Sequence, residues 1–144
     1  MSPAGDLDLV VGGEDGRLKY FKNTGSSTKP EFEEMTESKN PFDSIDVGSR
    51  SAPAFADLDG DGREEVVTGK RRYAHNGHDP GGEEELIICT YSFDKQSSKF
   101  TRRVLSKGGE VGAGHYPIIT DIEKDGDLDV VLPGKSGLYL LRRR

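Results

Sequence analysis

The sequence lacks most of the features that cross-link a small protein or attach it to a membrane. Its 144 residues include no tryptophan and one cysteine, Cys89. A single cysteine excludes an intramolecular disulfide and a zinc site built from several cysteines. No apolar run approaches the roughly 20 residues of a membrane span, and the first residues show neither the basic region nor the apolar run of a signal peptide. We therefore expect no membrane insertion.

The composition lies at the polar edge of the globular range. Hydrophobic and charged residues each make up 32% of the chain, with 19 glycines and 7 prolines. A conventional core would be thin, so another source of stability is needed. The 26 acidic and 20 basic residues give a net charge of −6, which argues against nucleic acid as a partner and is compatible with a divalent cation.

The chain contains an internal repeat. Three segments, 5–12, 62–69 and 126–134, each begin with a glycine, continue through acidic residues and end in a short apolar run. Their first glycines, Gly5, Gly62 and Gly126, are 57 and 64 residues apart, close to the length of a four-stranded propeller blade. The second and third copies also share an upstream half, at 52–62 and 115–126, which the first copy lacks.

Each copy reads as short strands between turns, without a stretch of helical period. We predict ten strands, at 7–12, 17–22, 31–36, 53–57, 65–69, 86–93, 100–106, 117–121, 129–132 and 137–141. In the strand 86–93 both faces are partly apolar, with Ile87, Cys89, Tyr91 and Phe93 on one and Leu86, Ile88 and Thr90 on the other. Such a strand suits a sheet packed between two neighbours.

The predicted fold is all-β, with about two and a half four-stranded blades of a β-propeller and no substantial helix. Residues 1–50 form a partial blade with a truncated acidic loop, 51–110 a complete blade with a calcium loop, and 111–144 a partial blade with a calcium loop. Because the chain starts and stops in mid-unit, two sheet faces would be left uncovered. We expect either self-association or the remaining blades of a longer parent protein to cover them.

The loop before the second apolar run has acids at alternate positions. Asp57-Leu58-Asp59-Gly60-Asp61-Gly62-Arg63-Glu64-Glu65 has the spacing D-x-D-x-D-G-x-x-E, and the third copy repeats it from Asp121. A Ca²⁺ ion takes six to eight oxygens, and alternate acids can turn inward together while the glycine permits the reversal. The expected ligands of about two Ca²⁺ ions are the side chains of Asp57, Asp59, Asp61, Glu65, Asp121, Glu123, Asp125 and Asp129 and the carbonyls of Arg63 and Asp127.

Two other kinds of loop share part of this pattern. An EF-hand loop begins in the same way, but it needs a bidentate Glu at the twelfth position and a following helix. Thr68 and Leu132 occupy those positions within predicted strands, so the EF-hand interpretation fails. Ordinary Asp-Gly turns favour the same residues for backbone reasons alone, and this alternative stays open. In the first copy, Ala4 replaces the third acid, so we expect no cation site there.

All three histidines fall on loops expected at the opposite end of the sheets from the acidic loops. His75 and His78 lie in a long glycine-rich loop and His115 in a later connection. Together they are weak candidates for a catalytic site or for a Zn²⁺ or similar ion. Solvated loop histidines are the simpler interpretation, although long loops on rigid scaffolds often bind ligands.

The second copy contains the stretch Ala56-Asp57-Leu58-Asp59-Gly60-Asp61-Gly62, which is followed by an apolar strand and by Thr68-Gly69-Lys70. A Gly-x-Leu-x-Tyr strand lies at 16–20, in another copy. In these motifs the chain resembles the FG-GAP/VCBS repeat family. The members of this family are calcium-binding β-propeller repeats similar to those of integrin α-chain heads and of many secreted microbial proteins. The resemblance implies blades that usually come seven to a ring, a structural Ca²⁺ ion in each acidic loop, and a secreted or cell-surface location. Glu65 and Glu123 depart from the usual Asp.

These features support three hypotheses about function. The leading one is a non-catalytic, calcium-stabilised propeller segment that binds a carbohydrate or protein ligand. The rival is part of a propeller-type sugar lyase or dehydratase with a metal at His75, His78 and His115. The third is that only a longer parent protein has a function.

Overall fold

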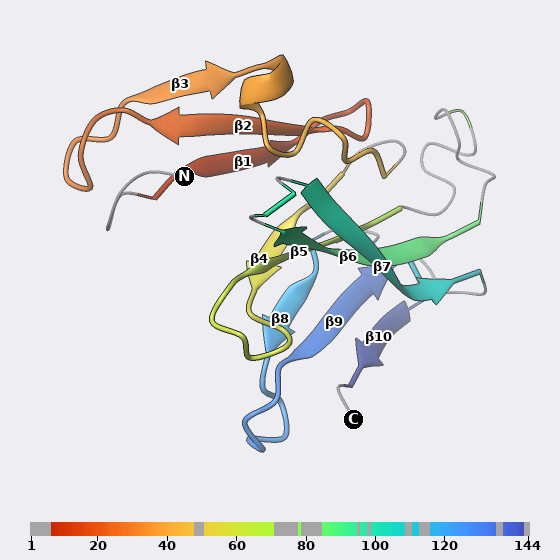
Figure 1. Ribbon diagram of the computed structural model, residues 1–144. Helices are drawn as coiled ribbons and strands as arrows, with labels where there is room; N and C mark the ends of the chain where they lie inside the picture. The colour runs from red at the N-terminus through yellow and green to blue at the C-terminus, as the bar shows by residue number, and fades with distance from the viewer. Residues whose placement is uncertain are drawn as a thin grey trace.

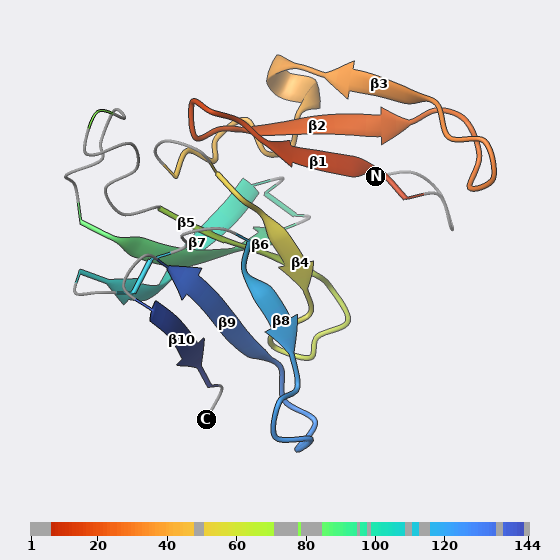
Figure 2. The same ribbon diagram turned by 180° about the vertical axis from the view of Figure 1, so that it is seen from behind.

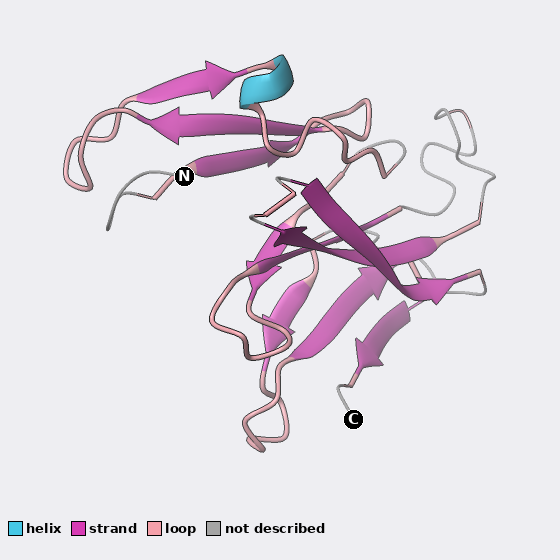
Figure 3. Cartoon of the chain, in the orientation of Figure 1, coloured by secondary structure: helices cyan, strands magenta, loops and turns pink. Residues whose placement is uncertain are grey.

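The computed structural model describes residues 7–47, 51–70, 78, 85–94, 96–97, 99–108, 111–112, 116–134 and 137–142. Ten strands account for its regular structure, and a single turn of 3₁₀ helix, η1 (Glu37–Lys39), is the helix found in these ranges (Figure 3). The strands are β1 (Leu9–Gly12), β2 (Leu18–Asn23), β3 (Phe32–Met35), β4 (Ala54–Ala56), β5 (Glu65–Gly69), β6 (Ile87–Asp94), β7 (Lys99–Lys107), β8 (Ile118–Thr120), β9 (Asp129–Gly134) and β10 (Gly137–Leu141). The all-β prediction is confirmed.

The strands form three separate antiparallel sheets, seen one below another in Figure 1. The first has the order β1-β2-β3, the second β4-β5-β6-β7 and the third β10-β9-β8. Every pairing joins strands that follow each other in sequence and run antiparallel. We refer to them as the first, middle and third sheet.

The middle sheet is buried on both of its faces. Within β5, Val66 belongs to a core cluster shared with the first sheet, and its neighbour Val67 belongs to a cluster shared with the third. Strand β6 repeats the division, because Cys89 packs with the first cluster and Ile88 with the second. Neighbouring residues of a strand point to opposite faces, so the sheet lies between two partners. The predicted two-sided burial of this strand is confirmed, and Cys89 is a buried free cysteine.

A segment without regular structure fills the space between the first and middle sheets. Phe42, Ile45 and Val47 are all buried in the first cluster. Asn40 fixes the start of this segment by donating a side-chain hydrogen bond to the carbonyl of Leu18 in β2, at 2.9 Å. Sequence periodicity did not mark these residues as core, because they lie outside any strand or helix.

The inner edges of the sheets meet closely. Strands β4 and β8 lie side by side in Figures 1 and 2 and contact each other directly. At the end of β1, a Cβ atom on Gly12 would lie 1.9 Å from the carbonyl oxygen of Ser51, which precedes β4. Glycine is therefore required there by the approach of the next sheet. In the part of the chain that the structure describes, no helix has the length and hydrophobicity needed to cross a membrane.

Candidate metal site

The loop between β4 and β5 is organised by Asp57. Its two carboxylate oxygens accept backbone hydrogen bonds from Gly60 at 2.8 Å and from Gly62 at 2.9 Å. Both glycines have positive φ, 79° and 82°, a conformation that costs a residue with a Cβ atom. The sequence D-x-D-G-D-G thus folds the loop around the first aspartate.

The other two aspartates of the loop lie beside the first. Asp59 accepts a hydrogen bond from the backbone N–H of Asp61 at 3.1 Å, and Asp61 accepts one from Arg63 at 2.9 Å. One carboxylate oxygen each from Asp57, Asp59 and Asp61 lie within 4.8 Å of one another. Among the described residues, these three aspartates form the group of candidate metal ligands whose ligand atoms lie this close together.

Arg63 is the cation already present in this cluster. Its Nη2 atom lies 2.8 Å from Oδ2 of Asp61, and its Nε atom donates to the same oxygen at 3.1 Å. The guanidinium is partly exposed, so solvent screens the pair and limits its energy. The sequence pattern predicts a ligand role for the carbonyl of Arg63 but does not predict this side-chain ion pair.

Glu65 lies at the base of the loop, where β5 begins, and is only 5% exposed. Its Oε2 atom accepts a hydrogen bond from the backbone N–H of Leu58 at 2.8 Å. Burial raises the pKa of the Glu65 carboxyl, the hydrogen bond from Leu58 lowers it, and the charges of Asp59, Asp61 and Asp57 raise it further. Four carboxylates therefore share one small region with little positive charge.

The loop between β8 and β9 has the same backbone design. Asp121 accepts backbone hydrogen bonds from Asp125 at 3.1 Å and from Gly126 at 2.9 Å. Asp129, 4% exposed, accepts one from Ile122 at 3.3 Å, which corresponds to the bond between Glu65 and Leu58. Lys124 has φ of 57° at the position that Gly60 occupies in the other loop.

The side chains of this second loop are arranged differently. Glu123 forms an ion pair with Arg142, with Oε1 and Nη1 2.7 Å apart, and Asp121, Glu123 and Asp125 do not form a cluster like that of the first loop. Asp125 accepts a backbone hydrogen bond from Asp127 at 3.0 Å. No sequence pattern predicts that Arg142 reaches this loop, because the contact joins residues that are distant in the chain.

In the first repeat, the residues expected to form an inactive loop lie outside the described ranges. The acid equivalent to Glu65 and Asp129 is Asp8, and it faces its own sheet. It accepts hydrogen bonds from the hydroxyl of Tyr20 at 2.7 Å and from the backbone N–H of Asn23 at 2.9 Å. Burial, followed by the interaction with Asp8, raises the pKa of Tyr20.

The histidine prediction is not tested by the structure. His75 and His115 lie outside the described residues, and His78 is exposed in a turn.

The turn that follows β6, which includes Gln96 and Ser97, lies near the Asp57 loop. Hydrogen bonds from Ser97 and Gln96 lower the pKa of Asp94, and the charge of Arg63 lowers it slightly further.

Comparison with known proteins supports the repeat pattern. No curated protein and no solved structure matches the chain. Residues 4–68 match the family model described as the FG-GAP-like repeat, a segment that runs from the first repeat through the Asp57 loop and most of β5. The match agrees with the resemblance seen in the sequence, and this segment is similar to an FG-GAP-like repeat.

Proposed function

We propose that this chain is a calcium-binding FG-GAP/VCBS propeller segment, in which the three sheets are blades and the Asp57 loop holds the stronger cation site. The observation that carries the proposal is the convergence of Asp57, Asp59 and Asp61 above the buried carboxylate of Glu65. An Asp-Gly turn alone needs one acid to accept the backbone hydrogen bonds. Asp59, Asp61 and Glu65 also accept backbone hydrogen bonds, but these bonds do not require the carboxylates to gather in one place.

The dimensions of the cluster suit Ca²⁺. Calcium–oxygen distances of about 2.3–2.6 Å place ligands on opposite sides of an ion roughly 5 Å apart. The three aspartate oxygens lie within 4.8 Å of one another, so they can contact one such ion with little rearrangement. Asp57, Asp59, Asp61 and Glu65, with the carbonyl of Arg63, would hold it. A bound ion would neutralise charge that the fold otherwise concentrates around Glu65.

The two loops are expected to differ in affinity. In the Asp57 loop, Ca²⁺ competes with the exposed guanidinium of Arg63 for Asp61. In the Asp121 loop, Arg142 holds Glu123 and the carboxylates are not gathered. Organising that second site requires breaking an ion pair and moving side chains, which costs binding free energy. We therefore expect two unequal sites.

The role that follows is structural. A cation that ties β4 to β5 stiffens the loop and leaves the neighbouring turns available for a ligand. We propose a carbohydrate or protein as that ligand and a secreted or cell-surface setting, both by family likeness. Extracellular calcium modules bind with dissociation constants of about 10⁻⁴ to 10⁻³ M, so a site of moderate affinity is sufficient.

Calorimetric titration with Ca²⁺, together with thermal unfolding in calcium and in chelator, tests the proposal. We expect heat of binding and a higher melting temperature in calcium. Asp59→Ala and Asp61→Ala should each abolish the stronger site, whereas Asp15→Asn should change neither result. Asp15 is a suitable control because it accepts a single turn hydrogen bond, from the backbone of Arg17. A wild-type protein whose melting temperature ignores calcium would refute the proposal.

A further inference from the structure

The three sheets repeat the same orientation of side chains. Leu9, Val66 and Val130 follow the equivalent acids Asp8, Glu65 and Asp129. Val66 packs in the cluster shared with the preceding sheet, the first, and Val130 in the cluster shared with its own preceding sheet, the middle one. Among the described residues no sheet precedes the first sheet, and Leu9 is 43% exposed.

The next residue of each strand shows the opposite orientation. Val10 packs toward the middle sheet and Val67 toward the third. Val131 occupies the same position in the third sheet, and by strand alternation it faces away from the middle sheet, where the described residues form no further sheet. The chain therefore presents two uncovered sheet faces. The face on the first sheet corresponds to those that pack against a preceding sheet, and the face on the third sheet corresponds to those that pack against a following sheet.

The uncovered face of the third sheet is apolar, and that of the first sheet combines apolar residues of β1 with the exposed ion pair of Lys19 and Glu34. On the first sheet, Leu9 and Val11 share the outward face of β1, and Val11 is 40% exposed. On the third sheet, Val131 is paired with Ile118 on one side and Leu140 on the other, which makes an apolar row across three strands. Ile118 is 55% exposed and Leu140 37%.

We propose that a second copy of this chain covers these faces, its first sheet stacking on the third sheet of the copy before it. The chain already contains this type of interface twice, between its first and middle sheets and between its middle and third sheets. The two outward faces are the missing halves of a third such interface. The first sheet of a second copy can pack on the third sheet of this copy in the same order as neighbouring sheets pack within the chain.

Such an interface is heterologous, because it joins two different patches of the same molecule. Each added copy leaves a new third sheet uncovered, so association continues until a ring closes or a filament forms. An isologous dimer through a single face would leave the other pair of faces exposed to water, which is unfavourable for apolar surface.

Two surface variants test this arrangement. Leu9→Lys places a charge on the outward face of the first sheet, and Leu140→Lys does so on the third sheet. Both positions are solvent-exposed, so the fold is expected to persist, and circular dichroism checks that it does. Thr101→Lys, at an exposed position of β7, adds the same charge away from both faces and serves as the control.

Molar mass is measured by light scattering and sedimentation over a range of concentrations. The wild type and Thr101→Lys should associate, and each of the other variants alone should be monomeric. An equal mixture of Leu9→Lys and Leu140→Lys should give a dimer of one copy of each that grows no further, since each supplies one intact face. A monomeric wild type, a single variant that still associates, or a mixture that stays monomeric would overturn the proposal.

Discussion

Thr68 is enclosed in the middle of β5, and among the described side chains its Oγ1 is the buried polar atom that has no hydrogen-bond partner. A buried hydroxyl without a partner loses its bonds to water and gains none in return, at a cost of about 1–3 kcal/mol. Its neighbours in the strand, Val66 and Val67, are fully buried apolar residues. The position is therefore suited to a side chain of similar shape without the hydroxyl.

We expect Thr68→Val to increase the free energy of unfolding by about 1 kcal/mol, since it removes the unpaired hydroxyl and keeps the branched shape. Urea denaturation measures the change. Thr101→Val is the matched control, because the hydroxyl of Thr101 is exposed to water on β7, and its effect should be close to zero. Destabilisation by Thr68→Val would show that the hydroxyl has a function in the folded protein.

Glu65 provides a second prediction at the scale of a residue. Its pKa is raised, chiefly by burial, so the folded protein favours the protonated form. The corresponding stability is present at pH values below the ordinary glutamate pKa and is lost as the pH rises through the raised, folded-state pKa. In chelator, the wild type should therefore lose stability relative to Glu65→Gln as the pH rises from acidic to neutral.

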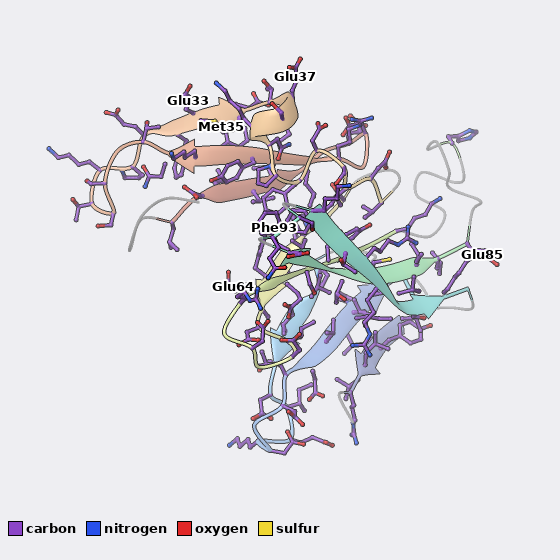
Figure 4. All side chains as sticks on the ribbon, in the orientation of Figure 1. Glu33, Met35, Glu37, Glu64, Glu85 and Phe93 are labelled. Atoms are coloured by element: carbon purple, nitrogen blue, oxygen red, sulfur yellow. The ribbon has the colours of Figure 1, made fainter. Side chains whose placement is uncertain are left out.

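Urea denaturation in chelator at a series of pH values measures this difference. The amide of glutamine can keep the hydrogen bond from Leu58 while removing the charge. Glu64→Gln is the control, because Glu64 is the adjacent acid and is exposed (Figure 4), so its curve should follow the wild type. A Glu65→Gln curve parallel to the wild type at all pH values would show that the buried charge carries no cost.

At the scale of the element, the two acidic loops form an internal comparison. They share the hydrogen bond from the fifth residue after the first aspartate and positive φ at two positions, Gly62 and Gly126 at one and Gly60 and Lys124 at the other. A Cβ atom on Gly60 would meet no atom within 4 Å. Any effect of substitution there is therefore conformational and not steric.

Exchanging the residue types at these positions should have opposite effects. Gly60→Ala should destabilise the protein by about 1 kcal/mol, because the left-handed conformation is unfavourable for a residue with a Cβ atom. Lys124→Gly should stabilise it by a similar or smaller amount, since glycine also gains freedom in the unfolded chain. Thermal unfolding in chelator separates this effect from cation binding. Changes of the same sign would contradict the shared loop geometry.

Most strands could be predicted from sequence because they are short runs with apolar residues bounded by Asp, Gly or Pro, and the repeat supplied independent copies of the same pattern. The loop backbone could be predicted for the same reason, since Asp57 and Asp121 bond to nearby residues. The core segment at Phe42 and Ile45 could not, because its burial depends on how two sheets meet. The contact between Arg142 and Glu123 likewise depends on folding.

At the scale of the whole molecule, the middle sheet determines whether the three sheets unfold together. Both of its faces supply core, so it connects two clusters that share no residues. Ile88 is fully buried between the middle and third sheets. Ile118 is the same type of residue as Ile88, but it lies on the outward face of the third sheet and is more than half exposed.

Ile88→Ala should lower the free energy of unfolding by about 2–5 kcal/mol, as expected for a large-to-small change in a packed core. Ile118→Ala, the matched control, should cost much less in a monomeric sample, because most of its side chain already contacts water. If the stack is one cooperative unit, hydrogen exchange of Ile88→Ala should show protection falling together in β2 and in β9. These strands belong to the two outer sheets, so a loss confined to β9 would mean that the first sheet unfolds independently of the other two.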